Sequence, residues 1–491
     1  MLKRTLFSGL LSLMFVGGFS QKKYEPTWES IDSRPVEQWF KDAKLGIFIH
    51  WGPYSVPAWS PKGTYSEWYQ LWLQSKSLFG NGNFTGSEVY DHHVKTYGEN
   101  FDYYNFGNMF TAKEFDADKW ADLIEKSGAK YMVITTKHHD GFCLWPSKEA
   151  NKAFGRNWNA VDAGPKRDLL KELEVAVKKT SVKFGTYYSL YEWYNPLWRQ
   201  DPEKYALEHM HPQFKDMVEN YKPELVWADG DWDLEPEKWH SPELLTWLFN
   251  ESSVGDKVVI NDRWGKGIRF NHGGYFTTEY QSGLDGSHPW EEIRGIGFSF
   301  GYNKNEDSWD YASARTLIYL LLNVVSNGGN LLLDIGPDAD GNIPPIMQDR
   351  LLEIGSWLKV NGEAIYGTTK WKKRSCQWSE DGKKDWMPEG KHYLPADFIL
   401  KQTVEQQPGY AVREIFFTQK GNDVFAIVPK FPKDKLVIRD FKAPSGSKIT
   451  LLGYDKELGY KQVGKDLHIE SPDLSIDELP CSYAWTFKIS K

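Results

Sequence analysis

Short and almost continuously apolar runs recur along the first three quarters of the chain. Eight of them read as strands, at residues 44–50, 130–136, 183–189, 224–229, 257–262, 275–279, 295–300 and 330–336. Runs that are apolar throughout, rather than alternating, are typical of parallel strands that are covered on both faces. The pattern therefore predicts a parallel β-sheet in this part of the chain.

Amphipathic helical patterns lie between several of these runs. They occupy residues 115–128, 167–180, 242–251 and 314–329, and Asp116 or Asp118 is placed to cap the first of them. Eight strands alternating with helices over about 340 residues indicate a (β/α)8 TIM-like barrel. We assign this α/β domain to residues 21–367, within which residues 75–106 read as a loop-like insertion.

The pattern changes after residue 367. Short apolar runs at 423–431, 447–454 and 482–490 are separated by Gly, Pro, Asp and Lys. Short strands between turn-forming residues are typical of antiparallel sheets. Residues 368–491 are therefore predicted to form a C-terminal antiparallel β-sandwich domain.

Residues 1–20 have the pattern of a secretory signal peptide. Lys3 and Arg4 precede an apolar run that ends in small residues near Ser20. That run is too short to span a membrane, and no later segment is apolar enough to do so. We therefore expect an exported protein, periplasmic or extracellular, without a membrane span.

Composition narrows the choice of partners. The 59 Lys and Arg residues face 67 Asp and Glu residues without a dense basic tract, so we expect no nucleic-acid partner. The three cysteines are odd in number and widely spaced, which argues against a disulfide framework and a cysteine zinc site. Aromatic residues make up 15% of the chain, and their rings can stack on sugars as well as fill cores.

Polar and aromatic side chains gather at the carboxyl ends of the predicted strands. They are His50 and Trp51, His138 to Asp140, Tyr187 and Tyr188, Trp227 and Asp229, Asn261 to Arg263, Glu279, and Phe300. These ends share one face of a barrel, where active sites lie. Each feature alone has a structural interpretation, such as a tight turn at Asp229 and Gly230. Their convergence on one face favours a binding site.

These residue types suit the cleavage of a glycosidic bond. Histidines and an arginine can donate hydrogen bonds to hydroxyls, and Trp51, Trp68, Trp227 and Phe300 offer apolar surface. Asp229 and a glutamate supply one carboxylate to attack the anomeric carbon and one acid to protonate the leaving oxygen. A metal site made of His138, His139 and Asp140 is disfavoured, because adjacent side chains on an extended segment point to opposite sides.

An ordered set of segments resembles family 29 of the glycoside hydrolases, the α-L-fucosidases. The segments are KLGIFIHWGPYSVPAW, SEWY, TTKHHDGFCLW, ELVWADG, NDRWG, TTEY, WEEIRGIGFSFGYN and GGNLLLDIGPDADGNIP. The resemblance implies a retaining, exo-acting hydrolase that releases terminal α-L-fucose from glycans and needs neither cofactor nor metal. It implies Asp229 as nucleophile and fucose contacts from His50, Glu67, Trp68, His138, His139, Tyr187, Trp227, Arg263 and Phe300.

Two glutamates are candidates for the general acid/base. Glu279 matches the acid/base of some bacterial relatives, and Glu291 matches a residue proposed for animal relatives. The segment around Glu291 reads as the start of a helix, where the helix dipole favours a charged carboxylate. A general acid needs a raised pKa instead, so we favour Glu279.

Three other functions are compatible with this pattern. The protein could be an α-L-galactosidase acting on L-galactosylated glycans, because an apolar pocket rejects one added hydroxyl only modestly. A sugar-binding protein with a degenerate site is disfavoured, since Asp229 and both glutamates are present. A TIM-barrel metalloenzyme is the remaining alternative, and it would lose activity to a chelator.

Overall fold

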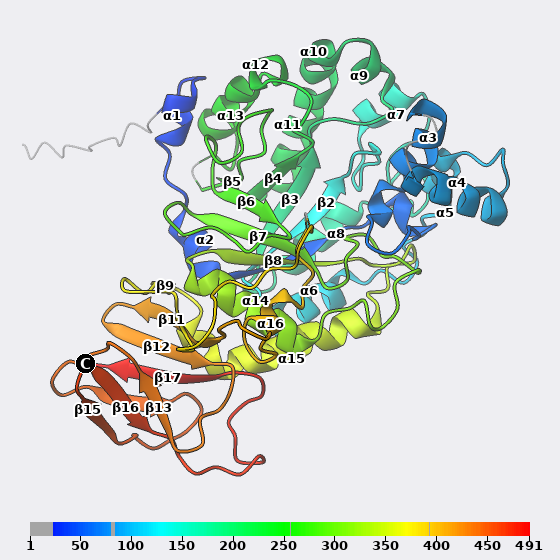
Figure 1. Cartoon of the computed structure of the whole chain (residues 1–491). Coiled ribbons are helices and arrows are strands. Elements are labelled where there is room, and N and C mark those ends of the chain that lie inside the picture. The colour runs from blue at the N-terminus through cyan, green and yellow to red at the C-terminus, as the bar shows by residue number, and fades with distance from the viewer. Residues whose placement is uncertain (1–22, 80–83, 256, 392) are drawn as a thin grey trace, which may run out of the picture.

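The computed structural model describes residues 23–79, 84–255, 257–391 and 393–491 (Figure 1). Eight parallel strands form the first domain, with bounds β1 Leu45–Ile49, β2 Tyr131–Lys137, β3 Lys183–Ser189, β4 Leu225–Asp229, β5 Val259–Ile260, β6 Phe276–Glu279, β7 Trp290–Gly295 and β8 Asn330–Ile335. They are hydrogen-bonded in the order β5-β4-β3-β2-β1-β8-β7-β6. A parallel bridge between Asn261 and Tyr275 joins the two ends of this order. The predicted barrel is confirmed.

The seventh strand was predicted wrongly. Residues 295–300 were expected to form it, whereas β7 is Trp290–Gly295 and the residues after it form a loop. Glu291, Glu292 and Arg294 made this stretch look polar, yet all three are buried in the strand. Glu292 pairs with Arg294 at 3.0 Å, which allows both charges to be buried together.

Helices surround the barrel. The longer ones are α6 Ala117–Lys126, α8 Leu169–Val177, α11 His211–Tyr221, α13 Ser241–Asn250, α14 Ala314–Ser326 and α15 Pro345–Asn361. Asp116 is the N-cap of α6 and accepts a hydrogen bond from the Lys119 backbone at 3.1 Å. Short helices complete the layer: α1 Trp28–Asp32, α2 Gln38–Ala43, α7 Lys148–Phe154, α9 Pro196–Gln200, α10 Pro202–Tyr205, α12 Pro236–Trp239, with the π-helix η5 Ala206–Met210.

The insertion at 75–106 is helical, not loop-like as predicted. It contains the end of α3 Tyr69–Phe79, then α4 Phe84–Tyr97, η4 Tyr103–Asn105 and the start of α5 Phe106–Met109. Aromatic contacts hold it together: the Tyr69 hydroxyl lies 3.0 Å from His93 Nδ1, and the rings of Tyr97 and Phe106 are 4.9 Å apart. The core of this insertion is made largely of aromatic rings, so its pattern lacked an aliphatic helical stripe.

Antiparallel sheets form the C-terminal region, as predicted. One contains β10 Cys376–Trp378, β11 Arg413–Lys420, β12 Asp423–Val428, β17 Trp485–Ser490 and β14 Lys448–Leu451, with β9 Thr369–Lys370 beside β11. The other contains β13 Lys435–Ile438, β16 Asp466–Glu470 and β15 Tyr460–Val463. Phe417, Leu436, Leu467 and Phe487 belong to their shared core.

The sandwich packs against the barrel through α14 and α15. The Tyr319 hydroxyl donates to the Pro429 carbonyl at 3.0 Å, and the Trp357 indole donates to the Ala484 carbonyl at 2.9 Å. The predicted division after residue 367 falls between η6 Gly362–Ala364 and β9. Most of residues 371–412 are irregular, apart from β10 and the short α16 Phe398–Lys401.

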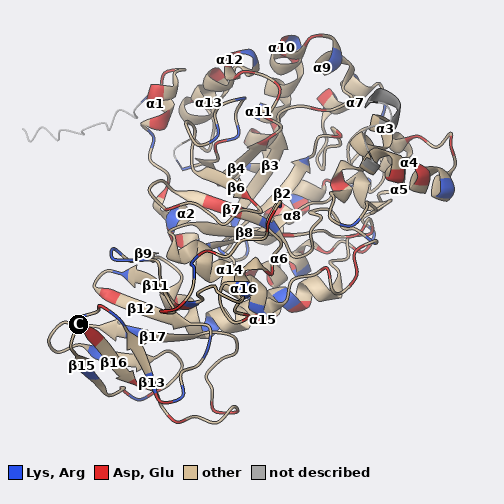
Figure 2. Cartoon of the chain, viewed as in Figure 1, with Lys and Arg blue, Asp and Glu red and all other residues tan. Residues whose placement is uncertain are grey.

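Several other predictions concern the chain as a whole. The predicted signal peptide at 1–20 lies outside the described residues. Among the helices that the structure describes, none is long and apolar enough to cross a membrane. Cys143, Cys376 and Cys481 are free thiols that form no disulfide bond. Acidic and basic residues are intermixed along the outer helices (Figure 2).

Candidate active site

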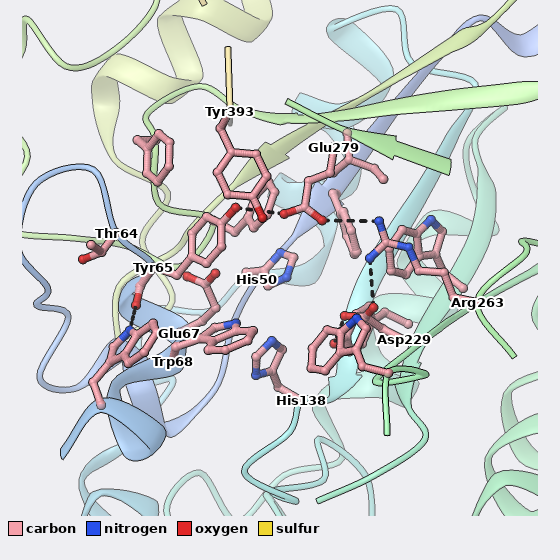
Figure 3. Close-up of a pocket in the computed structure, with 18 of the residues that line it drawn as sticks. His50, Thr64, Tyr65, Glu67, Trp68, His138, Asp229, Arg263, Glu279 and Tyr393 are labelled. Carbon is pink, nitrogen blue, oxygen red and sulfur yellow. Dashed lines mark hydrogen bonds and ion pairs between the residues drawn. The ribbon is translucent and has the colours of Figure 1, made fainter. Parts of the chain in front are cut away.

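A pocket of about 420 Å³ lies at the carboxyl ends of the barrel strands. This volume is in the range of about 300–1,000 Å³ that is typical of small-molecule sites. Ten of the predicted site residues line it: His50, Glu67, Trp68, His138, Tyr187, Trp227, Asp229, Arg263, Glu279 and Phe300 (Figure 3). Of the other two, His139 lies just behind the pocket wall, and Glu291 lies in the barrel interior.

Asp229 is the last residue of β4, so its side chain emerges at the pocket end of the barrel. Its carboxylate accepts hydrogen bonds from Arg263 Nη1 at 2.9 Å and from the Tyr187 hydroxyl at 3.0 Å. Burial alone would raise the pKa of Asp229, but the positive charges of Arg263 and Arg269 outweigh it and hold the pKa at about 2. Asp229 is therefore an anion at neutral pH, as a nucleophile must be.

His139 lies beside Asp229 as a neutral imidazole. Burial lowers the pKa of His139 to about 4, although Asp229 acts in the opposite direction. The Ser189 hydroxyl gives its single proton to the Tyr191 carbonyl at 2.5 Å, so His139 Nδ1 must donate to Ser189 at 2.6 Å. Nε2 then carries a lone pair and lies 3.5 Å from Asp229 and 3.4 Å from the Tyr187 hydroxyl.

Glu279 ends β6 and faces Asp229 across Arg263. Its Oε1 accepts from the Tyr65 hydroxyl at 2.8 Å, and its Oε2 accepts from Arg263 Nη2 at 3.3 Å. Arg263 itself is buried, with its guanidinium 4.5 Å above the Trp227 ring and its Nε donating to Thr277 at 2.9 Å. One rigid guanidinium thus holds both carboxylates at the same pocket.

Glu291 is placed differently from the sequence prediction. It lies inside β7 rather than at a helix start, so the helix-dipole argument against it was wrong. Its carboxylate accepts hydrogen bonds from Tyr131 and, at 3.0 Å, from the Trp227 indole. Glu279 remains the better acid/base for another reason: it lines the pocket, whereas Glu291 is enclosed beneath it.

Replacing Glu291 by glutamine should change the pH dependence of stability more than catalysis. Burial raises the pKa of Glu291 to about 7, so the folded state holds its proton more tightly than the unfolded state. Stability from this group is full below about pH 4.5 and is lost as pH rises through about 7. The wild type should lose this contribution between pH 5 and pH 8, and Glu291→Gln should not. The free energy of unfolding of the variant minus that of the wild type should therefore increase by on the order of 3 kcal/mol over this range.

Urea unfolding of both proteins at several pH values measures this difference. The other buried carboxyl groups titrate in both proteins, so their contributions cancel when the two free energies of unfolding are subtracted. The loss in kcat/KM should stay well below the roughly 10²–10⁴-fold that a general acid supplies. A loss of that size would identify Glu291 as the acid instead, whereas a pH-independent stability difference would contradict its raised pKa.

Three further side chains can form hydrogen bonds with the hydroxyls of a sugar. Burial lowers the pKa of His50 to about 3, and its Nδ1 lies 2.6 Å from Asp334, which leaves Nε2 for a ligand. His138 Nδ1 and Glu67 Oε1 are buried polar atoms without a hydrogen-bond partner in the protein. Such orphaned atoms are costly unless a ligand satisfies them. Burial also raises the pKa of Glu67 to about 8, against the hydrogen bonds from Gly301 and Ser299.

The segment after β2 divides its side chains between two environments. His138 faces the pocket, whereas Lys137 points to the other side of the sheet and pairs with the buried Glu192 at 2.9 Å. Asp140 caps the turn by accepting from the Phe142 backbone at 3.0 Å. Trp51, predicted to face the ligand, also points outward and packs on Trp120 at 4.9 Å. Successive side chains of an extended segment point to opposite sides, so Trp51 points away from the pocket that His50 faces.

The sequence reasoning missed several pocket residues. They are Tyr65, Trp72, Trp232, Arg269, Phe298 and Tyr393 among the lining side chains. Tyr65 stands directly before the SEWY motif that contains Glu67, so it could have been found. Arg269 and Tyr393 lie in irregular segments away from strand ends, where no local pattern marked them. Within the described ranges, no group of three or more His, Cys, Asp or Glu side chains is placed to hold a metal ion.

Comparisons with known proteins agree on one family. The α-L-fucosidase family model matches residues 14–363, and the α-L-fucosidase C-terminal domain model matches residues 407–490. Plasma α-L-fucosidase of Rattus norvegicus is 40% identical over 485 residues, covering 95% of this chain and 94% of the relative. α-L-Fucosidase of Dictyostelium discoideum is 45% identical over 370 residues, covering 73% and 78%.

The solved structures give the same result. The crystal structure of Thermotoga maritima α-fucosidase in complex with a mechanism-based inhibitor is 36% identical, with a TM-score of 0.76, and the match covers 96% of this chain and all of that one. An α-L-fucosidase of Bacteroides thetaiotaomicron has a TM-score of 0.67 at 24% identity, a similarity that shows only a shared fold. The chain therefore belongs to the α-L-fucosidase family, family 29 of the glycoside hydrolases.

Proposed function

We propose that this protein is an exo-acting α-L-fucosidase that removes terminal α-L-fucose from glycans with retention of configuration. The arrangement of Asp229 and Glu279 on one pocket, both bound by Arg263, carries the proposal. Retaining enzymes need two carboxyl groups roughly 5–5.5 Å apart, one ionised and one able to donate a proton. The pocket ends within the barrel, which suits a terminal sugar rather than the middle of a chain.

The first step joins the sugar to Asp229. An oxygen of the Asp229 carboxylate attacks the anomeric carbon, the bond to the leaving oxygen breaks, and Glu279 gives its proton to that oxygen. The product is a β-linked glycosyl ester. The negative charge of Asp229 is lost as the ester bond forms, so the Tyr187 hydroxyl that donates to this carboxylate at 3.0 Å can then donate to a sugar oxygen instead.

The second step restores the enzyme. Glu279, now a carboxylate, takes a proton from water, and the resulting oxygen attacks the anomeric carbon from the opposite face. The ester bond breaks and returns its electron pair to Asp229. Arg263 stays beside both carboxylates, so the negative charge that moves between them remains paired. Two inversions give α-L-fucose.

The sugar assignment is tested with nitrophenyl α-L-fucoside and nitrophenyl α-L-galactoside. The second sugar is the first with a hydroxyl added at C6, and Phe48, Trp227 and Phe300 make much of the pocket surface apolar. We expect kcat/KM for the fucoside to be higher by about 10- to 100-fold, the usual penalty for an added hydroxyl in an apolar pocket. Equal or faster cleavage of the galactoside would make the protein an α-L-galactosidase, a function that none of the comparisons favours.

We also propose that the protein is exported and acts in the periplasm or outside the cell. The basic residues Lys3 and Arg4 and the apolar run after them support this proposal. The N-terminal sequence of protein recovered from a non-cytoplasmic fraction should begin near Gln21. Recovery of the uncleaved chain from the cytoplasm alone would contradict it.

A further inference from the structure

Tyr393 enters the pocket from outside both conserved domains. The two family models end at residue 363 and begin again at residue 407, so Tyr393 lies between them. Its side chain nevertheless lines the pocket beside Glu279 (Figure 3). A segment that connects barrel and sandwich therefore contributes a side chain to the site.

The barrel holds this segment through its backbone. The Leu394 N–H donates to the Tyr280 carbonyl at 2.8 Å, and Arg294 Nη1 of β7 donates to the Leu394 carbonyl at 2.8 Å. Arg294 is fully buried, and its Nη2 also donates to the Gln281 carbonyl at 2.6 Å. Its guanidinium lies 5.3 Å from the ring of the buried Phe398, which anchors the following turn. A buried arginine with these partners fixes the position of Tyr393.

The Tyr393 ring belongs to an aromatic wall around the acid. It lies 6.1 Å from Tyr65, 5.6 Å from Tyr280 and 6.3 Å from Phe298. Tyr65 is the residue that donates to Glu279, and Tyr280 follows Glu279 in the chain with a left-handed backbone, φ 50°. Burial, and next the charge of Glu279, raise the pKa of Tyr393, so its hydroxyl stays protonated.

The position of Tyr393 beside Glu279 determines which part of the substrate its ring can contact. The general acid must lie next to the leaving oxygen, so a half-exposed side chain that flanks it in the pocket, as Tyr393 does, borders the leaving group rather than the fucose. Half-buried aromatic rings offer a flat apolar face with a polar tip, which suits the apolar face and hydroxyls of a sugar. Tyr393 presents such a ring.

We propose that Tyr393 is a specificity-determining residue that binds the sugar to which fucose is attached. This inference rests on the proposed fucosidase function and on Glu279 as its acid. It assigns the connecting segment a role in selecting the aglycone, while the barrel residues select fucose. The bound aglycone packs on the Tyr393 ring.

Two substrates with equally poor leaving groups test the proposal. Methyl α-L-fucoside and a fucosyl disaccharide that the wild type cleaves both release an alkoxide that needs protonation, but only the disaccharide reaches the Tyr393 ring. In Tyr393→Ala, the ratio of kcat/KM for the disaccharide to kcat/KM for the methyl fucoside should fall at least tenfold, mainly through KM. In Tyr393→Phe, which keeps the ring, the ratio should fall less than threefold.

Tyr410→Ala is the matched control, because Tyr410 is a half-buried tyrosine of the same connecting segment that does not line the pocket. It should leave the ratio at the wild-type value. An equal loss on both substrates in Tyr393→Ala would mean that Tyr393 only positions the acid or stabilises the fold, and it would overturn the proposal. An unchanged ratio would also overturn it. A wild type that cleaves neither fucoside would instead contradict the proposed function.

Discussion

Replacing Asp229 by asparagine should lower kcat/KM by four orders of magnitude or more, since loss of a nucleophile removes the covalent route altogether. The amide keeps the shape of the side chain, and its one oxygen can still accept from Arg263 while its NH2 group donates to the Tyr187 hydroxyl. Fucose binding should therefore persist. Kinetics with an aryl fucoside, together with calorimetric titration of fucose, measures the two quantities separately.

Azide extends this test. In Asp229→Gly, azide can occupy the space left by the carboxylate and displace the leaving group directly, so β-L-fucosyl azide should form. Asp231→Asn is the matched control: Asp231 is a buried carboxylate near Asp229, bound to Arg269 at 2.5 Å, but it does not line the pocket. It should lose far less activity and gain nothing from azide. Wild-type-like turnover in Asp229→Asn would remove Asp229 from the nucleophile role.

Replacing Glu279 by alanine should produce a loss that depends on the leaving group. A sugar alkoxide needs a proton to depart, so kcat/KM for a fucosyl disaccharide should fall about 10²–10⁴-fold. Dinitrophenolate departs unaided, so kcat/KM for dinitrophenyl α-L-fucoside should change little. Comparing the two substrates in wild type and variant measures the contribution of the acid.

The second half-reaction gives an independent readout. Without Glu279 as base, the glycosyl ester on Asp229 should accumulate, and azide should release it as α-L-fucosyl azide. Glu291→Gln serves as the control, because it alters a buried carboxyl that lies outside the pocket. If azide rescues a Glu291 variant and not Glu279→Ala, Glu291 is the acid/base despite its position in β7.

Much of the barrel was predictable because buried parallel strands are apolar on both faces. Strand β7 was not, since several of its polar side chains form their hydrogen bonds with distant groups that no local pattern shows. Glu291 is satisfied by Tyr131 and Trp227 from two other strands, and Arg294 by the backbone of Leu394, a hundred positions away. The insertion was not predicted to be helical for a similar reason, because rings from α4, from α5 and from the loop between them pack on one another.

The site was predictable where residues stand at strand ends. Asp229 and Glu279 terminate β4 and β6, so the barrel geometry alone brings them to one face. The direction of a side chain just beyond a strand was harder, as Trp51 shows. Tyr393 could not be predicted from the sequence. Its position depends on how the connecting segment packs on β7, a tertiary contact without a sequence signature.

The central claim is that a covalent ester forms on Asp229. It is tested most directly by treating the protein with 2-deoxy-2-fluoro-α-L-fucosyl fluoride, whose fluorine at C2 slows hydrolysis of the ester while the fluoride leaving group still permits its formation. Mass spectrometry of the digested protein should then find one 2-fluorofucosyl group on the peptide that contains Asp229, with fragment ions placing it on that carboxylate. A label on Glu279, Glu67 or any other side chain, or substrate turnover without any trapped ester, would contradict the account.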